Sequence, residues 1–428
     1  MSCPAVQIRN QILKSFEGRF NIWKADHMMS LTLLFDLDDT LLDTNLEAFV
    51  PAYFQALAKH LEGHVSPNVM LRALVHGMGL MTENEDPTRT LQEVFETDFY
   101  PTLDIPREEL IDLIEEFYDE VFPTLREHTQ QKPDAVPLIE WALSCGYRVA
   151  IATDPLFPRK ATYHRVRWAG LDPEQIELIS TFEDFHFSKI HPAYYAEVLG
   201  RLGWPEGAVL MVGNEVRRDL IPANQLGLAT YFIDGEPASS PGFEAGRGKL
   251  ADLRPWLESI DLSALEPSFK SRDAILGIMA STPAVLRSLT SSLTEEDWRH
   301  EPTRDDWAMN EIICHLRDTE IEIHQLQLNL MLERADAFIP RPDTGVWASE
   351  REYLNVDGPS ALTEFASARI ENMHKLKNID DEIWSRRARH AIFGPTDFLE
   401  VAGFMADHDR MHIQQAWKTL RVPVSRRV

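Results

Sequence analysis

The sequence predicts a chain of two parts: an α/β doubly wound parallel sheet with an inserted helical cap, then an all-α four-helix bundle. Two observations lead to this prediction. Over roughly the first 260 residues, short apolar runs alternate with helical patterns, which is typical of a parallel sheet covered by helices. From about residue 273 onward, amphipathic helical segments follow one another without a convincing strand pattern.

The strands of the predicted sheet are short apolar runs. The first, Leu31–Phe35, stops at acidic residues, as a buried parallel strand does at its carboxyl end. Similar runs occur at 148–152, 208–212 and 229–233. Helical periodicity occupies residues 46–130, which predicts a helical cap inserted after the first strand. A helix near 250–257 is expected to close this domain.

The carboxyl-terminal part contains four amphipathic segments that predict an antiparallel bundle. They lie near 273–293, 308–334, 359–378 and 396–420. The expected domains are therefore 29–262 and 273–428, joined by a linker at 263–272. Residues 1–28 are expected to be an extension outside both domains, and the position of the first strand favours Met28 or Met29 as the native start.

Composition restricts the classes of partner. The chain has 428 residues and a formal net charge of −26, so its surface repels nucleic acid phosphates and anionic lipid. No apolar run approaches the ~20 residues that span a bilayer. The three cysteines, Cys3, Cys145 and Cys314, lack metal-ligand spacing and a disulfide pattern, which favours a reducing, cytoplasmic location. We expect no nucleic acid or membrane partner.

A first group of chemically competent residues falls at the ends of predicted strands. The run Phe-Asp-Leu-Asp-Asp-Thr-Leu places Asp36 and Asp38 after the first strand, and Thr153 follows the second. Gly213-Asn-Glu-Val-Arg-Arg-Asp219 follows the third, and Lys189 lies in the segment between the second and third. Ligands of open parallel sheets bind at this edge, and carboxylates, a hydroxyl and a lysine are the groups that phosphoryl transfer needs.

The order and spacing of these residues resemble the haloacid dehalogenase superfamily over residues ~29 to ~260. The resemblance implies that Asp36 is the nucleophile and a magnesium ligand, and that Asp38 is the general acid and base with its backbone carbonyl on the metal. It implies phosphoryl binding by Thr153 and charge screening by Lys189. Asn214 and Asp219 would complete the Mg²⁺ site.

One position departs from the superfamily pattern. An Asp usually follows the glycine of the last motif, and here the residue is Asn214. An amide oxygen can still bind magnesium, but it brings no charge, so we expect weaker metal binding unless Asp219 or Glu215 compensates.

A second group of residues lies in the predicted bundle. His408 and His412 are four residues apart on the last helix and so share one helical face. His315 lies on the inward face of the second helix. Three inward histidines from facing helices form a half-shell with open positions, which is typical of catalytic metal sites.

The stretches Trp307–Asp318 and Ala406–Gln415 resemble the DinB-like superfamily of four-helix-bundle metalloproteins. The resemblance implies a nickel, zinc or iron site at His315, His408 and His412. His324 and His374 have no predicted role, and Cys314 is interpreted as a packed residue.

The leading functional hypothesis is magnesium-dependent hydrolysis of a small phosphate monoester through an aspartyl-phosphate on Asp36. A second hypothesis places catalysis in the bundle, as a thiol-dependent transferase or hydrolase, beside a weakened amino-terminal domain. A third makes the bundle a ligand sensor or a dimerisation module that forms a homodimer. Asn214 favours the second hypothesis, and the lack of an evident acid or base near the histidines, other than Glu320, favours the third.

Overall fold

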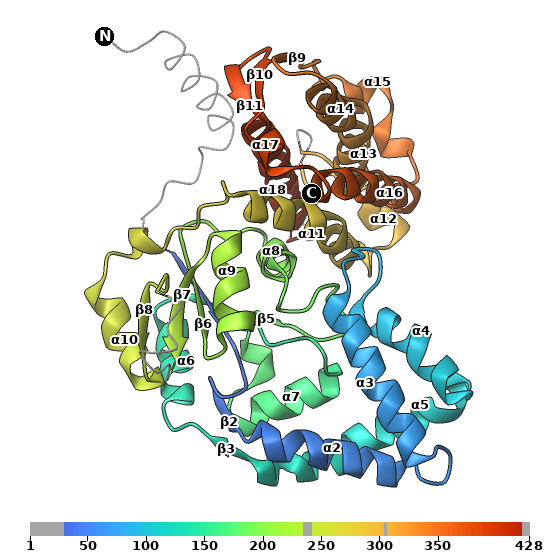
Figure 1. The fold of residues 1–428 in the computed structure, drawn as a ribbon, viewed down its shortest axis with the longest axis vertical. Coiled ribbons are helices and arrows are strands. Elements are labelled where there is room, and N and C mark those ends of the chain that lie inside the picture. The colour runs from blue at the N-terminus through green and yellow to red at the C-terminus, as the bar shows by residue number, and fades with distance from the viewer. Residues whose placement is uncertain (1–29, 234–241, 304–305, 422–428) are drawn as a thin grey trace.

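The computed structural model describes residues 30–233, 242–303 and 306–421 (Figure 1). The predicted extension at 1–28, with its alternative starts Met28 and Met29, lies outside the described residues. The chain folds into an α/β part followed by a helical part, as the sequence predicts. No helix in the described ranges combines the length and apolar character needed to cross a membrane.

A six-stranded sheet with strand order β5-β4-β1-β6-β7-β8 forms the centre of the amino-terminal part. Its strands are β1 (Leu31–Phe35), β4 (Arg148–Ile151), β5 (Leu178–Ile179), β6 (Ala208–Gly213), β7 (Ala229–Ile233) and β8 (Gly246–Gly248). Every neighbouring pair is parallel. Phe35 on the central strand lies opposite Ile151 and Val212, so the residues after these three strands meet at one edge. β5 and β8, of two and three residues, were not predicted.

The cap is a group of helices inserted between two short strands, β2 (Leu42–Thr44) and β3 (Thr129–Gln131), which pair antiparallel at its base. Its helices are α2 (Leu46–His60), α3 (Pro67–Glu83), α4 (Leu91–Leu103) and α5 (Arg107–Glu116), followed by the π-helical turn η1 (Phe117–Val121) and the 3-10 helix η2 (Phe122–His128). The cap lies to one side of the sheet in Figure 1.

The two faces of the sheet belong to different cores because side chains alternate along a strand. Leu34 of β1 packs with α8 (Pro192–Arg201) and α9 (Ile221–Leu226). Leu33 and Phe35 belong to the opposite core, together with the cap and with α6 (Ala135–Ser144), α7 (Arg159–Trp168) and α10 (Leu250–Ser259). The sheet therefore lies between two separately packed apolar layers.

The carboxyl-terminal part contains long helices close to the four predicted segments. They are α11 (Arg272–Thr290), α13 (Met309–Thr319) continuing through the π-helical turn η7 (Glu320–His324) into α14 (Gln325–Glu333), α16 (Gly358–Lys377) and α18 (Phe398–Arg421). Short helices α12 (Glu295–Trp298), α15 (Trp347–Glu350) and α17 (Asp381–Trp384) connect them.

The expectation of no strands after residue 273 is wrong. β9 (Ala337–Ile339), β10 (Arg387–His390) and β11 (Gly394–Asp397) form a three-stranded sheet at one end of the bundle. Each strand has three or four residues, and β10 and β11 are mostly polar, so neither length nor an apolar run distinguishes them from loops.

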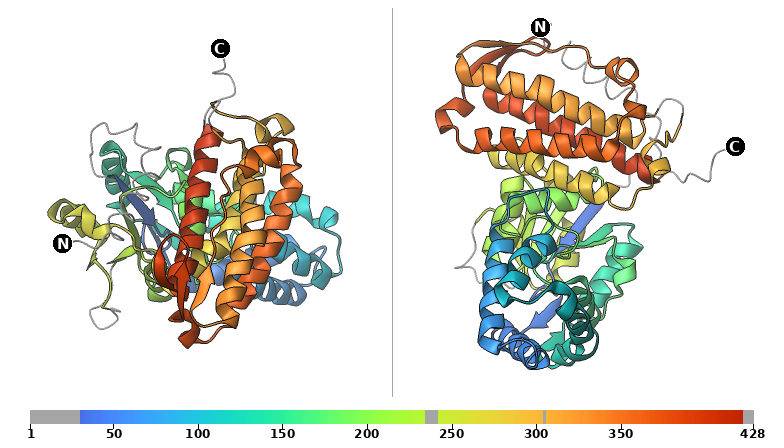
Figure 2. Two further views of the ribbon diagram at one scale, coloured as in Figure 1. Left: turned by 90° about the horizontal axis from the view of Figure 1, so that it is seen from above. Right: turned by 90° about the vertical axis from the view of Figure 1, so that its right-hand side faces the viewer.

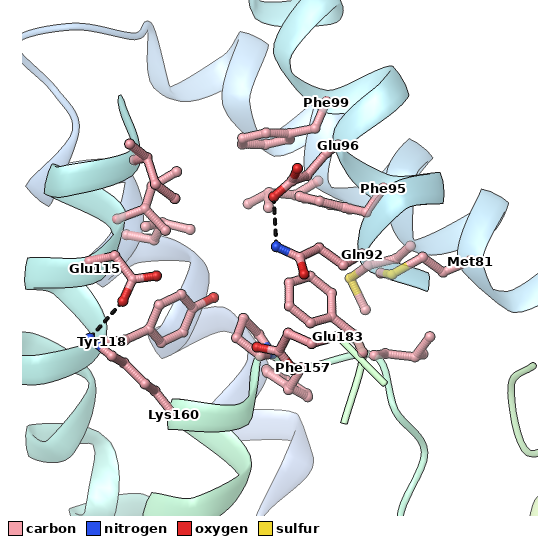
Figure 3. A pocket seen from close by; sticks show the side chains of 18 of the residues that line it. Met81, Gln92, Phe95, Glu96, Phe99, Glu115, Tyr118, Phe157, Lys160 and Glu183 are labelled. Carbon is pink, nitrogen blue, oxygen red and sulfur yellow. Dashed lines mark hydrogen bonds and ion pairs between the residues drawn. The ribbon is translucent and has the colours of Figure 1, made fainter. Parts of the chain in front are cut away.

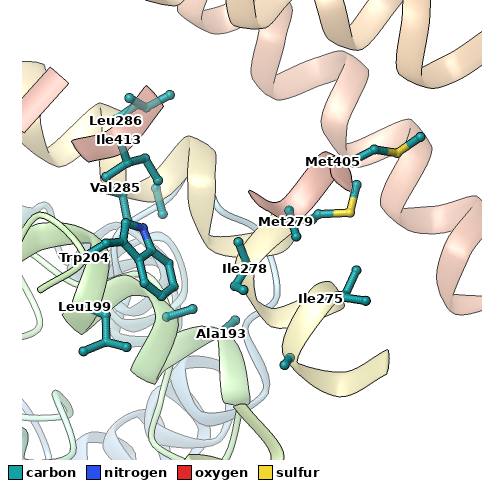
Figure 4. Packing of buried hydrophobic residues seen from close by; sticks show 14 of the residues in the cluster. Ala193, Leu199, Trp204, Ile275, Ile278, Met279, Val285, Leu286, Met405 and Ile413 are labelled. Atoms are coloured by element: carbon teal, nitrogen blue, oxygen red, sulfur yellow. The ribbon is translucent and has the colours of Figure 1, made fainter. Parts of the chain in front are cut away.

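The helical part packs directly on the amino-terminal part through α11, which lies between α8 and the other bundle helices (Figure 2). Buried residues of α8, α11 and α18 form one continuous apolar cluster that also contains Leu34 (Figure 4). The contact is close: a Cβ atom added to Gly200 would lie 2.6 Å from Val285. The predicted linker is also packed, since Leu265 is buried and the Ser268 amide donates to the Gly227 carbonyl.

Candidate active site and candidate metal centre

Lys189 lies between two carboxylates at the carboxyl edge of the sheet. Its Nζ donates to Asp36 Oδ1 at 2.7 Å and also forms an ion pair with Asp219. Asp36 is 7% exposed, whereas Lys189 and Asp219 are 1% exposed. Asp36, Lys189 and Asp219, which lie far apart in the sequence, thus form one row of charged side chains.

The electrostatics of this row favour a protonated lysine. Burial alone would lower the pKa of Lys189, but the charges of Asp219 and Asp36 raise it well above its ordinary value. Burial, and then the negative charge of Asp36, raise the pKa of Asp219, and Lys189 opposes that rise. Lys189 therefore keeps a positive charge beside Asp36 at neutral pH.

Asp219 organises the loop that follows β6. Its Oδ2 accepts hydrogen bonds from the backbone amides of Asn214 (2.9 Å) and Glu215 (2.8 Å). A Cβ atom on Gly213 would lie 2.4 Å from the Asp219 carboxyl group, so only glycine permits this approach. Both oxygens of Asp219 have partners here, and its predicted role as a direct metal ligand would require one of these contacts to open.

The donor set fits a magnesium ion. The terminal amide atom of Asn214 lies 3.3 Å from Asp36 Oδ2 and 3.2 Å from the Asp38 carbonyl oxygen. If this atom is the amide oxygen, its separations from the other two oxygens are close to the ~3.0 Å edge of an octahedron with 2.1 Å bonds. If it is the nitrogen, it donates hydrogen bonds to the same two oxygens. In one orientation the Asn214 amide can bind a cation together with these oxygens, and in the other it forms hydrogen bonds to them when no cation is bound.

The Asp38 side chain is held by partners on α7 and β2. Its Oδ2 forms an ion pair with Arg165 of α7, and its Oδ1 accepts a hydrogen bond from Thr44 Oγ1 at 2.8 Å. Arg165 is 2% exposed, and its guanidinium carbon lies 4.9 Å from the ring centroid of Phe157. Burial lowers the pKa of Arg165 to about 10, so it stays charged at neutral pH. The sequence did not predict this partner.

Thr153 lies at the same edge, where β4 ends. It is 3% exposed, and its carbonyl oxygen accepts hydrogen bonds from Ser180 Oγ (2.6 Å) and Tyr194 Oη (2.7 Å). The following residue, Asp154, accepts from the Lys189 amide at 3.3 Å and pairs with Arg218. These contacts tie the end of β4 to the Lys189 segment and to the loop after β6.

A pocket lined by aromatic and aliphatic side chains lies between the cap and the start of α7 (Figure 3). Phe157 belongs to its wall and also contacts Arg165, so the pocket adjoins the Asp38 ion pair. Its aromatic lining residues are Tyr53, Phe95, Phe99, Tyr100, Tyr118, Phe157 and Phe182. Three acidic lining residues already have partners: Glu96 pairs with Arg107, Glu115 with Lys160, and Glu183 accepts from the Arg159 amide. The wall therefore offers mainly apolar contact.

The second group of predicted residues also comes together. His315 from α13 and His408 and His412 from α18 each offer a ligand atom, and these atoms lie within 4.8 Å of one another. The Nε2 atoms of His315 and His408 are 3.1 Å apart. Two nitrogens bound tetrahedrally to one ion at 2.0–2.1 Å would be about 3.4 Å apart, so the triad is close to ligating geometry.

The surroundings keep the triad neutral and oriented. Burial lowers the pKa of His315 to about 3 and that of His412 to about 4. His412 Nδ1 is hydrogen-bonded to Gln415 Oε1 at 2.9 Å, which leaves Nε2 for a metal. Trp307 stacks parallel to His412, with ring centroids 6.0 Å apart. Neutral imidazoles with a fixed ring nitrogen are the form that binds metal ions.

A buried charge network lies beneath the triad. Arg369 of α16 pairs with Glu320 and with Asp409, and all three residues are fully buried. Glu320 also accepts from His324 Nδ1 at 2.9 Å, and the His324 ring lies 5.5 Å from that of His408. Glu320, which the sequence offered as the nearest candidate acid or base, therefore forms an ion pair with Arg369. His324, which had no predicted role, lies beside a predicted ligand, and no local motif marks it.

The comparisons with known proteins agree with this two-part fold. A family model of haloacid dehalogenase-like hydrolases matches residues 31–227, and a model of the DinB superfamily matches residues 279–416. The search of curated proteins finds no match. The chain therefore carries a haloacid dehalogenase-like hydrolase domain and a DinB superfamily domain.

Solved structures resemble each part separately. A 2-haloacid dehalogenase from Pseudomonas syringae pv. tomato DC3000 is 23% identical, with 54% of this chain and 99% of that chain covered and a TM-score of 0.41. A phosphatase of the superfamily from Thermococcus onnurineus is 21% identical (53% and 97% covered, TM-score 0.36). The four-helix-bundle protein YfiT from Bacillus subtilis is 17% identical (36% and 88% covered, TM-score 0.33). Such likenesses define no reaction for this chain.

Proposed function

We propose that the amino-terminal domain is a magnesium-dependent phosphatase that hydrolyses a small phosphate monoester through an aspartyl-phosphate on Asp36. The observation that carries the proposal is the buried row of Asp36, Lys189 and Asp219 at the sheet edge, next to the oxygens of Asp38 and Asn214. A carboxylate held beside a fixed ammonium group is suited to attack an anionic phosphoryl group, because the ammonium offsets the repulsion between the two anions.

The chain's own residues would divide the reaction as follows. Asp36 forms a bond to phosphorus as the ester bond breaks, and water then hydrolyses the acyl-phosphate and regenerates the carboxylate. Lys189 fixes Asp36 and neutralises charge, and Thr153 binds a phosphoryl oxygen. Magnesium, held by Asp36, Asn214 and the Asp38 carbonyl, would neutralise charge on the transferred group.

Asp38 would serve first as the general acid and then as the general base. Its ion pair with Arg165 affects which leaving groups it can assist. Arg165 favours the ionised form of Asp38, which suits activation of water but opposes protonation of the leaving oxygen. An aryl oxygen leaves with less help from an acid than an alkyl oxygen does. We therefore infer that the leaving group is aromatic or otherwise stabilised as an anion.

The cap pocket supports the same inference. Its aromatic wall adjoins the Asp38–Arg165 pair through Phe157, so an apolar leaving group could lie there while the phosphoryl group is at Asp36. Burying an aromatic ring against such a wall contributes through area and through favourable ring–ring geometry. The apolar part of this wall offers no hydrogen-bond partners to the hydroxyl groups of a sugar, which favours an aromatic ring there.

The test is a comparison of phenyl phosphate, naphthyl phosphate, glycerol phosphate and glucose phosphate as substrates, with and without magnesium. We expect turnover of the aryl esters, a preference for them over the alkyl esters, and loss of about 10³-fold or more in Asp36→Asn. Asp43→Asn is the matched control, since Asp43 is exposed on β2 nearby and should keep full activity. Absence of magnesium-dependent turnover over the panel would refute the proposal.

A second candidate function is favoured by a specific observation, the histidine triad. We propose that His315, His408 and His412 hold a zinc, nickel or iron ion with open coordination positions. Metal analysis of the purified chain should find about one such ion, and His408→Ala should lose it. His374→Ala, an exposed change on α16, should retain it. Equal metal content in His408→Ala would remove this site.

A further inference from the structure

A small pocket adjoins the histidine triad on the side of the three-stranded sheet. It lies between the η7 segment and α18, and the segment after β9 lines it as well. The lining residues are Thr319, Ile323, His324, Gln327, Arg341, Thr344, His390, Val401, Phe404, Met405 and His408. One predicted metal ligand, His408, therefore faces the pocket directly, and a cationic side chain, Arg341, belongs to the same wall.

Arg341 has no carboxylate partner within the described residues: the residue is exposed, and no acidic side chain there forms an ion pair with it. Its charge reaches the neighbouring rings: burial, and then the charge of Arg341, lower the pKa of His390. An arginine without a carboxylate partner presents a planar fork of donors that fits an external carboxylate.

Three acidic residues of this part of the bundle have other partners. Glu320 is paired with Arg369. Asp318 accepts from Arg317, from Arg351 and from the Tyr353 hydroxyl group at 2.7 Å. Glu400 accepts from Thr396 Oγ1 at 2.8 Å.

Charge balance then points to a ligand. Histidine ligands bring no charge to a divalent ion, and Arg341 adds a positive charge on the same pocket. The buried network beneath the triad has two carboxylates, Glu320 and Asp409, against one guanidinium, and so adds a single negative charge. The remaining excess of positive charge is reduced by an anion that reaches both cations. An open position on a three-histidine ion is where such an anion can bind.

We propose that this pocket binds a small organic anion, with a carboxylate on Arg341 and a second donor atom on the open position of the ion held by His315, His408 and His412. The inference rests on the proposed metal site in the bundle. Thr344 and Gln327 supply neutral polar groups on the same wall, and Phe404 and Met405 give it an apolar side. The ligand class is therefore a short carboxylic acid with a second anionic or metal-binding end.

The experiment uses the full chain loaded with cobalt(II), whose visible absorption reports the ligands of the ion. Oxalate, malonate and succinate are the probes because they vary the distance between two carboxylates, and acetate is the probe with a single one. We expect at least one diacid to change the spectrum saturably and to bind more tightly than acetate. Calorimetry with the metal-free chain should show binding at least tenfold weaker.

Arg341→Gln should weaken the diacid about tenfold or more and leave the cobalt content and the free spectrum unchanged. Arg389→Gln is the matched control, since Arg389 is exposed on β10 next to His390 but does not line this pocket. Equal diacid affinity in Arg341→Gln and wild type overturns the proposal, and so does equal affinity with and without metal. Failure of the chain to take up cobalt overturns it by removing the metal site itself, an outcome that metal analysis separates from the first two.

Discussion

Substituting Ile278 tests whether the two domains share one core. Ile278 of α11 is fully buried in the cluster that joins α8 to the bundle (Figure 4). Ile278→Ala removes three carbon atoms, which at about 0.8 kcal/mol each gives about 2.4 kcal/mol of lost transfer free energy. The cavity left between packed helices adds to this, so we expect a loss of about 2–5 kcal/mol in the free energy of unfolding.

The assay is urea unfolding followed by hydrogen exchange and mass spectrometry, because peptides then report each domain separately. Peptides from β6 and from α13 should lose protection at one common urea concentration in the wild type, and Ile278→Ala should lower that concentration for both. Ile370→Ala is the matched control, since Ile370 is 41% exposed on α16 and its loss should change stability by about 0.5 kcal/mol or less. If the β6 peptides keep their wild-type midpoint while the α13 peptides shift, the shared core is refuted.

Three further predictions concern the two sites. Asn214→Asp adds a negative charge to the donor set, so calorimetry should show magnesium affinity raised about tenfold or more, and unchanged affinity would contradict the Asn214 assignment. Arg165→Gln frees Asp38 to hold a proton, so the ratio of kcat on glycerol phosphate to kcat on phenyl phosphate should rise several-fold; a constant ratio would count against the ion-pair argument. The pKa of His412 is about 4 when folded and about 6.5 when unfolded, so stability is present above pH 6.5 and is lost as the pH falls. At pH 5 this costs about 2 kcal/mol, and urea unfolding of the metal-stripped chain at pH 7.5 and 5.0 should show a smaller difference in His412→Asn; an equal difference would contradict the depressed pKa.

Much of the fold is legible in the sequence because its signals are local. β1 and β6 are apolar runs of five and six residues, and the bundle helices repeat apolar positions over many turns. The strands that were missed, such as β5 and β10, have two to four residues and no room for a periodic pattern. Short strands exist here because neighbouring elements pair with them, and that information is not local.

Some site residues could be predicted from the sequence and others could not, for similar reasons. Lys189 meets Asp36 as the resemblance to the hydrolase superfamily implies, because the order of the strands brings their ends together. Arg165 lies on α7, more than a hundred residues after Asp38 in the sequence, and no local motif marks it as the partner of Asp38. His324 is hidden for another reason: the π-helical turn η7 changes the helical register between His315 and His324, so spacing along an ideal helix misplaces it.

The docking of the two domains did have a sequence signal, in α8. Its residues from Ala193 to Gly200 are all buried, and this stretch reads Ala-Tyr-Tyr-Ala-Glu-Val-Leu-Gly, with no solvent face. The one charged side chain of this stretch, Glu197, pairs with His186 inside the protein. Every side of the stretch must therefore be covered, and the sheet covers only one of them. α11 covers the other. Because α8 begins three residues after Lys189, the bundle that packs on it also helps to fix the segment that carries this lysine. Removal of the bundle would therefore expose the outer side of α8 and loosen the support of Lys189, which makes the helical domain part of the structural basis of the proposed phosphatase site.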